Sequence, residues 1–138
     1  CTVREVGHYS CRSMTGNCAA LQSLADEPGR VQMNPADAAK LDITDGQLVW
    51  VRSRRGKVIT RASISERINA GAVYMTYQWW IGACNELTQD NLDPISKTPE
   101  TKYCAVQLEA IEDQRWAEDY ATTAYQSMKT RLITALNV

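Results

Sequence analysis

The sequence predicts a mainly β fold with flanking α-helices, in which about six strands joined by short turns form a small closed barrel. The first observation is the alternation of apolar residues over 48–51 and 58–64, which is typical of half-buried strands. The second is a pair of glycine-containing triplets at 54–56 and 69–71, each of which separates two apolar runs. The third is a long amphipathic pattern after Asp113, which predicts a helix outside the barrel.

The N-terminal part should contain a strand, a polar loop and a short helix. A strand is expected over 2–6, and Gly7 should end it. Alanine and leucine favour a helix over 18–25, with Asn17 as its N-cap. The sequence Glu-Pro-Gly at 27–29 should end that helix and lead into the next strand.

A second short helix should begin at Asn34, which can cap it while the following proline takes the first helical position. Asp37 falls in the first turn, where its charge favours the exposed N–H groups, and Leu41 should end the helix. An Asp-Gly pair at 45–46 then reverses the chain before the strand at 48–51.

The C-terminal half begins with a strand at 72–77, followed by a polar loop over 78–102. A compact fold that releases so long a loop usually uses it for binding. A last strand is expected over 103–108. The helix over 113–136 should pack on the barrel or on a neighbouring domain through an apolar stripe formed by Trp116, Tyr120, Ala124, Met128 or Ser127, Leu132 and Leu136.

With 138 residues the chain has room for a single domain over 1–138, with the barrel over 1–111 and the C-terminal helix over 113–136. The formal net charge of -1 gives no reason to expect nucleic acid as a partner. No apolar run approaches the ~20 residues of a membrane helix, so we expect no membrane insertion. The chain does not begin with Met, and we expect it to be an excised piece of a longer protein.

The cysteines occur at irregular spacing, at Cys1, Cys11, Cys18, Cys84 and Cys104. Their odd number argues against a disulfide framework and indicates reduced thiols in a cytoplasmic protein. His8, Cys11 and Cys18 can each bind zinc, but they lack the tight cysteine pairs that zinc sites usually show. A nucleophilic Cys11 paired with His8 would need a geometry that their spacing does not specify.

Six short motifs occur in order along the chain, namely Asn34-Pro35-x-Asp37-Ala38, Asp45-Gly46-x-x-Val49-x-Val51, Gly71-x-Val73-Tyr74, Asn85-x-Leu87-Thr88, Asp93-Pro94-x-Ser96 and Pro99-x-x-Lys102. Together they resemble the molybdopterin dinucleotide-binding domain at the C-terminal end of the molybdenum oxidoreductases related to dimethyl sulfoxide reductase. Two segments, 2–13 and 77–85, resemble in particular the formate dehydrogenases of the formate hydrogenlyase type. The resemblance covers nearly the whole chain.

This resemblance implies a six-stranded double-psi β-barrel, as in aspartate decarboxylase. It also implies the C-terminal domain of a molybdenum formate dehydrogenase, an oxidoreductase that converts formate to carbon dioxide. The domain would bind and orient the bis-molybdopterin guanine dinucleotide cofactor, with molybdenum or tungsten held by the whole enzyme. The metal ligand, the substrate-binding arginine and an iron–sulfur cluster would lie in preceding domains, so the isolated chain should be inactive. Hydrogenase and electron-transfer subunits of a formate hydrogenlyase complex are further partners that the resemblance implies.

The expected site follows from the chemistry of the cofactor, which presents polar ring edges, a pyrophosphate and a guanine. Arginines of the first segment can make forked contacts to phosphate or pterin oxygens, and Glu5 can accept hydrogen bonds from pterin or guanine N–H groups. The resemblance and this chemistry give a set of cofactor-binding residues, namely Thr2, Arg4, Glu5, His8, Ser10, Arg12, Tyr77, Asn85, Thr101 and Lys102. Thr101 stands where close family members often carry an aromatic ring. We expect neither a catalytic residue nor a metal ligand in this chain.

Two other functions remain open at this point. The chain can be the same domain of a nitrate reductase or another molybdenum reductase, because substrate choice resides mostly in the other domains. In a different class, it can be a cofactor-free β-barrel interaction module. The pair Trp79-Trp80 should cover the cofactor or an interdomain seam. All cofactor-binding expectations require the two polar segments to lie at one rim of the barrel.

Overall fold

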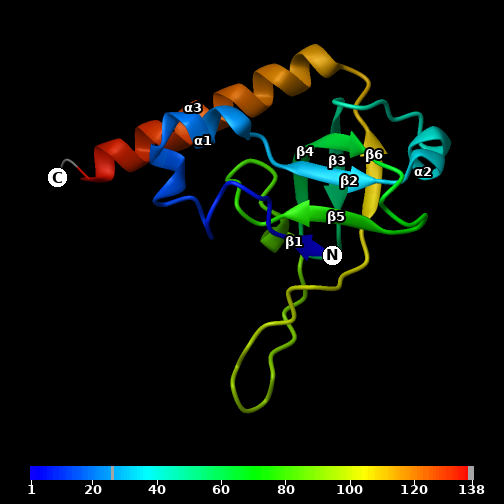
Figure 1. Cartoon of the computed structure of the whole chain (residues 1–138), viewed down its shortest axis with the longest axis horizontal. Coiled ribbons are helices and arrows are strands. Elements are labelled where there is room, and N and C mark those ends of the chain that lie inside the picture. The colour runs from blue at the N-terminus through cyan, green and yellow to red at the C-terminus, as the bar shows by residue number, and fades with distance from the viewer. Residues whose placement is uncertain (26, 137–138) are drawn as a thin grey trace.

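The computed structural model describes residues 1–25 and 27–136, and one six-stranded sheet forms its centre (Figure 1). The strands are β1 (Thr2–Val3), β2 (Arg30–Met33), β3 (Leu48–Arg52), β4 (Lys57–Ile64), β5 (Val73–Thr76) and β6 (Gln107–Ala110). Across the sheet they follow the order β1-β5-β2-β4-β3-β6. Neighbours are parallel in the pairs β1/β5 and β2/β4 and antiparallel in the other pairs.

Helices and one long loop surround this sheet. The helical elements are η1 (Thr15–Asn17), α1 (Ala19–Leu24), α2 (Pro35–Lys40), η2 (Cys84–Glu86) and α3 (Gln114–Leu136). Figure 1 shows α3 running along one side of the sheet, while the loop between η2 and β6 extends away from it. The mainly β fold with flanking helices is therefore confirmed.

The hairpin of β3 and β4 matches the period-2 pattern of the sequence. Val51 pairs with Val58, and Leu48 pairs with Arg61. The turn between the strands is closed by the Ser53 N–H, which donates to the Gly56 carbonyl at 2.9 Å. The predicted strands and the turn between them are confirmed.

The start of α2 is also as predicted. The Asn34 side chain accepts a hydrogen bond from the Ala36 N–H at 2.8 Å, which satisfies one exposed donor of the first helical turn. Asp37 accepts a hydrogen bond from the Gly71 N–H at 2.5 Å and pairs with Lys40 at 3.2 Å. The Gly71 hydrogen bond, followed by Lys40, lowers the pKa of the Asp37 carboxyl.

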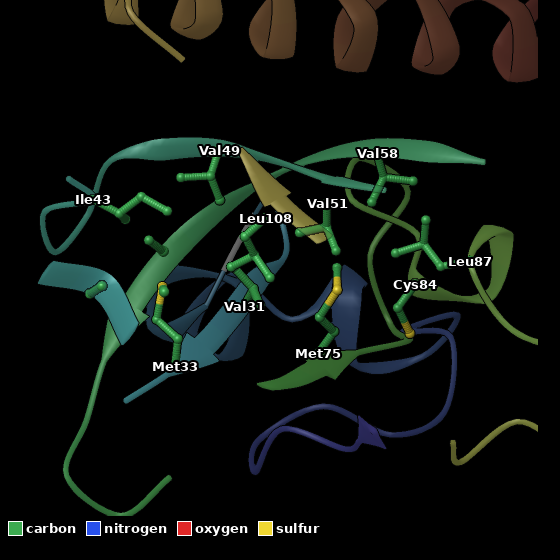
Figure 2. Packing of buried hydrophobic residues seen from close by; sticks show 12 residues of the cluster. Val31, Met33, Ile43, Val49, Val51, Val58, Met75, Cys84, Leu87 and Leu108 are labelled. Carbon is green, nitrogen blue, oxygen red and sulfur yellow. The ribbon is translucent and has the colours of Figure 1, made fainter. Parts of the chain in front are cut away.

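The main hydrophobic core lies on one face of the sheet, where side chains from β2 to β6 converge (Figure 2). Val31, Val49 and Val51 have no exposed surface, and Met75 and Leu108 pack beside them. Burying each valine contributes about 1.5–3 kcal/mol relative to an exposed position. The apolar periodicity of the strands therefore accounts for most of this core.

The predicted apolar stripe of α3 is correct at Ala124 and Met128, which pack against buried residues, but the buried face begins at Ala117 rather than at Trp116. Ala117 and Ala121 are buried against a second cluster that contains Leu48 and Ile59, whereas Trp116 and Tyr120 are about half exposed. The small alanine side chains allow the helix backbone to approach the sheet closely. The aromatic rings instead stack on each other at the edge, with ring centroids 5.2 Å apart.

Two further element predictions need correction. Asn17 does not cap α1: it ends η1, its side chain donates to the Ser13 carbonyl at 2.9 Å, and Cys18 is the N-cap. The last strand does not begin at 103, because its partner β3 ends at Arg52 in the hairpin turn. Only residues from Gln107 onward have a strand beside them.

The described residues do not close the sheet into a barrel. β1 and β6 are the two ends of the strand order, and the pairings of the described residues do not join them. A cleft of about 900 Å³ is lined by Val73 and Tyr74 of β5 and by Gln107 and Leu108 of β6. The sheet is open along this cleft, and the double-psi barrel stays a prediction.

Candidate functional site

Gln78 ties the N-terminal segment to the chain that follows β5. Its side-chain oxygen accepts a hydrogen bond from the Glu5 N–H at 2.7 Å, and its side-chain nitrogen donates to the His8 carbonyl at 2.8 Å. Its backbone carbonyl accepts a third hydrogen bond from the Arg12 Nε at 2.9 Å. Gln78 is only 1% exposed, and its contacts with His8 and Arg12 are buried while the one with Glu5 is partly buried.

Arg12 points inward rather than toward solvent. Its guanidinium lies over the Trp79 ring, with 4.1 Å between Cζ and the ring centroid, and it forms an ion pair with Glu27. The side chains of both ion-pair partners are almost fully buried, at 6% and 3% exposure. Arg12 therefore holds the N-terminal segment in place, and in this structure its charge is satisfied within the chain.

Glu27 joins three parts of the chain. Besides pairing with Arg12, it accepts hydrogen bonds from the Trp80 N–H at 3.0 Å and the Ile81 N–H at 2.9 Å. Burial raises the pKa of the Glu27 carboxyl, against the opposing influence of these two N–H groups and of Arg12. The carboxylate thus connects the N-terminal segment to the turn after β5.

His8 is also directed inward and is 4% exposed. Its Nε2 lies 2.8 Å from the Ala25 carbonyl and its Nδ1 lies 3.0 Å from the Thr15 hydroxyl. A carbonyl can only accept, so Nε2 carries a proton, and in the neutral ring Nδ1 accepts from the Thr15 hydroxyl. The ring also meets Trp79 edge-on at 5.4 Å between centroids.

Trp79 is 2% exposed, and its ring packs against His8 and Arg12 of the N-terminal segment. Gly29 lies directly against it, because a Cβ atom at position 29 would come within 2.6 Å of the Trp79 Cδ1. Trp80, in contrast, is partly exposed and contacts the Tyr125 ring of α3. The two tryptophans therefore have different roles, and neither forms an open aromatic platform.

A second tie joins Thr2 to the end of the long loop. The Thr2 hydroxyl donates to the Thr101 carbonyl at 2.8 Å, and the Lys102 ammonium donates to the Thr2 carbonyl at 3.2 Å. Thr2 and Lys102 also line a small cavity with the thiols of Cys84 and Cys104. Burial raises the pKa of the Cys84 thiol to about 11.

The other predicted residues are more dispersed. Arg4 is exposed, with its Cζ 5.9 Å from the centroid of the Tyr9 ring, and Ser10 and Asn85 are exposed. Tyr77 packs partly against the main core. Glu5 is intermediate in exposure, yet one of its carboxylate oxygens, Oε2, is buried with no hydrogen-bond partner among the described residues.

The N-terminal segment 2–13 and the polar loop 78–102 are therefore in contact at two places. One contact involves Thr2, Thr101 and Lys102, and the other is made by Gln78. None of the predicted binding residues lines the large cleft between β5 and β6, so the cleft and the predicted site are separate features.

Sequence reasoning missed Gln78 and Glu27 as site residues. Gln78 continues the alternation of Thr76, and both polar side chains are buried, which is a usable signal at the end of a strand. Glu27 precedes a proline and has the sequence context of a turn. Its partners lie 15 and 53 or 54 positions away, a separation that no local pattern reports.

No group of three or more His, Cys, Asp and Glu side chains in the described part of the chain is arranged to hold a metal ion. All of the cysteines are free thiols, and Cys11 and Cys18 are exposed. Within residues 1–25 and 27–136, none of the helices combines the length and the apolar character that crossing a membrane requires.

The chain is similar to known oxidoreductases. It is 69% identical over 131 residues to formate dehydrogenase H of Escherichia coli strain K12, a match that covers 95% of this chain and 18% of that protein. It is 40% identical over 110 residues to the F420-dependent formate dehydrogenase 2 subunit alpha of Methanococcus maripaludis, covering 80% of this chain and 16% of that protein. The chain thus spans less than a fifth of the length of these relatives.

The fold is shared with part of a solved enzyme, the acetylene hydratase from Pelobacter acetylenicus, at a TM-score of 0.67 and 17% identity. That match covers 80% of this chain and 18% of the hydratase chain. The family model described as Molydopterin dinucleotide binding domain matches residues 1–105, which include both polar segments. This chain belongs to the Molydopterin dinucleotide binding domain family.

Proposed function

We propose that this chain is the C-terminal domain of a molybdenum formate dehydrogenase and that it binds and orients the bis-molybdopterin guanine dinucleotide cofactor. The observation that carries the proposal is the 69% identity to formate dehydrogenase H over 95% of the chain. At that identity the same binding surface is expected in both proteins. Formate is accordingly preferred over nitrate as the substrate of the parent enzyme.

The residues of the site fit such a cofactor. The partnerless Oε2 of Glu5 is an acceptor for a pterin or guanine N–H group, because a buried carboxylate oxygen without a donor is costly. Arg4 and Lys102 are exposed cations and can pair with phosphate oxygens. Molybdenum or tungsten, when bound, would supply the redox chemistry in the whole enzyme.

The proposed binding set divides into two groups. Members of the first group can contact the cofactor because they are exposed or, at Glu5, have a carboxylate oxygen without a hydrogen-bond partner among the described residues. They are Arg4, Glu5, Ser10, Asn85 and Lys102. The remaining members support those contacts through packing, hydrogen bonds or an ion pair within the chain, and they are Thr2, His8, Arg12, Tyr77 and Thr101.

The finer architecture is proposed with the function. We propose a double-psi barrel over 1–111 and a helix over 113–136 as one domain over 1–138, supported by the fold match to acetylene hydratase. Preceding domains of the same enzyme are the proposed partners, together with hydrogenase and electron-transfer subunits of a formate hydrogenlyase complex. A cytoplasmic location is proposed, and the free thiols support it.

The test uses the full-length protein that contains this chain. Molybdenum and guanine nucleotide per polypeptide are measured, with formate-dependent dye reduction, in wild type, Arg4→Ala, Glu5→Gln and the surface control Arg67→Ala. A hydrogen bond to a charged group is worth about 1.5–3 kcal/mol, so the first two variants should lose about 10- to 100-fold in cofactor affinity. The control should match wild type.

Three outcomes would contradict the proposal. Nitrate reduction without formate oxidation by the wild type would move the domain to another molybdenum reductase. A full-length protein without guanine nucleotide would make it an interaction module. Unchanged cofactor content in both Arg4→Ala and Glu5→Gln would remove these residues from the site.

A further inference from the structure

We propose that Glu27 is a positioning residue for the cofactor site, because it fixes the N-terminal segment 2–12 against the segment 77–82. This inference rests on the proposed function and adds to it a residue outside the expected cofactor-binding set. Glu27 is to act through Arg12 and through the backbone of Trp80 and Ile81.

Glu27 uses both of its carboxylate oxygens to hold neighbouring parts of the chain. Oε1 accepts from the Trp80 N–H at 3.0 Å and pairs with the Arg12 guanidinium, and Oε2 accepts from the Ile81 N–H at 2.9 Å. A glutamine at this position has one oxygen and one NH2 group. Its NH2 would face one of the backbone donors, so at least one of these hydrogen bonds would be lost.

The contact between Glu27 and Arg12 continues through Gln78 to Glu5. Arg12 stands at a left-handed backbone position, with φ of 65°, which non-glycine residues adopt rarely. Its Nε donates to the Gln78 carbonyl, and the Gln78 side chain holds Glu5 and His8. The position of Glu5 is therefore linked to Glu27 through a continuous series of buried and partly buried contacts.

Removing only one charge of the Arg12–Glu27 ion pair should destabilise the protein. Arg12 is 7% exposed, and loss of the Glu27 charge would remove a carboxylate that pairs with its buried guanidinium. Removing both charges together avoids that cost but also removes the connection between the segments. This difference separates an effect on folding from an effect on the site.

The experiment compares Glu27→Gln, the double variant Arg12→Gln/Glu27→Gln and the exposed control Glu66→Gln with wild type in the full-length protein. Each is measured for guanine nucleotide retained per polypeptide after gel filtration and for melting temperature. We expect Glu27→Gln to lose about 10-fold or more in cofactor retention and to melt at a lower temperature. The double variant should recover the melting temperature but not the retention.

Two results would overturn the inference. One is that Glu27→Gln retains as much guanine nucleotide as wild type. The other is that the double variant recovers both nucleotide retention and melting temperature, which is the result expected if Glu27 only stabilises the fold. If Glu27→Gln does not fold, the double variant alone decides between these readings. A wild type that holds no guanine nucleotide would instead overturn the proposed function, and this inference with it.

Discussion

The sheet region from Arg30 to Thr76 and the N-terminal segment from Glu5 to Asn17 are held together by different forces. The sheet region buries valines and other apolar side chains in a shared core (Figure 2). The N-terminal segment has no regular strand and is fixed by hydrogen bonds, by the ion pair of Arg12 with Glu27 and by the face of Trp79. The comparison shows that a loop expected to bind a ligand can be positioned by polar contacts whose partners are distant in sequence.

The largest expected effect comes from breaking the ion pair in the N-terminal segment. Arg12→Met removes the cation that pairs with the buried Glu27 carboxylate, which should destabilise the segment by about 3–5 kcal/mol. Native-state hydrogen exchange should show lost protection over 8–17 while amides of β3 and β4 keep theirs. Equal loss in both regions would mean that the segment and the sheet unfold as one unit.

The next effect tests the corrected face of α3. Ala117→Leu adds three carbons to a side chain with no exposed surface and should overpack the second cluster, costing about 1–3 kcal/mol. Trp116→Leu, at a half-exposed neighbour, should change the stability by much less. Urea unfolding of both variants measures this difference, and a reversed order would restore the predicted stripe.

A smaller effect is expected at the start of α2. Asn34→Ala removes the side-chain acceptor for the Ala36 N–H and should cost about 1 kcal/mol, as loss of an N-cap usually does. Asn17→Ala is the matched comparison, because Asn17 does not cap α1. If the two variants lose the same stability in urea unfolding, capping is not the reason.

The smallest effect concerns a surface ion pair that links α3 to β4. Arg61 donates to Glu118 at 2.7 and 2.9 Å, and these hydrogen bonds lower the pKa of the Glu118 carboxyl below 4.5. The stabilisation is present above the pKa of the unfolded group and is lost as the pH falls through the lower folded value. Because Glu118 is half exposed, the pair is worth less than about 1 kcal/mol.

Urea midpoints at pH 7 and pH 3 check this pH dependence. The wild type should lose a little more stability between these pH values than Glu118→Gln, which cannot titrate at that position. An identical loss in both proteins would show that the ion pair contributes nothing measurable.

The same comparison explains what the sequence could and could not predict. Local signals were sufficient for the β3–β4 hairpin and the Asn34 cap, because each depends on residues within a few positions. The inward orientation of His8 and Arg12 depends on Trp79 and Gln78, about 70 positions later, so no local pattern contains it. The family resemblance is confirmed over residues 1–105, and the binding residues that it implies stay a prediction.

Gly29 has a consequence for how this fold can vary. Since a single added carbon at position 29 would collide with the indole of Trp79, the two positions must change together. A relative that carries any side chain at position 29 should have a smaller residue at position 79. Its N-terminal segment would then lack the indole ring against which His8 and Arg12 pack here. The absence of one methyl group thus restricts which sequences can keep this loop in place.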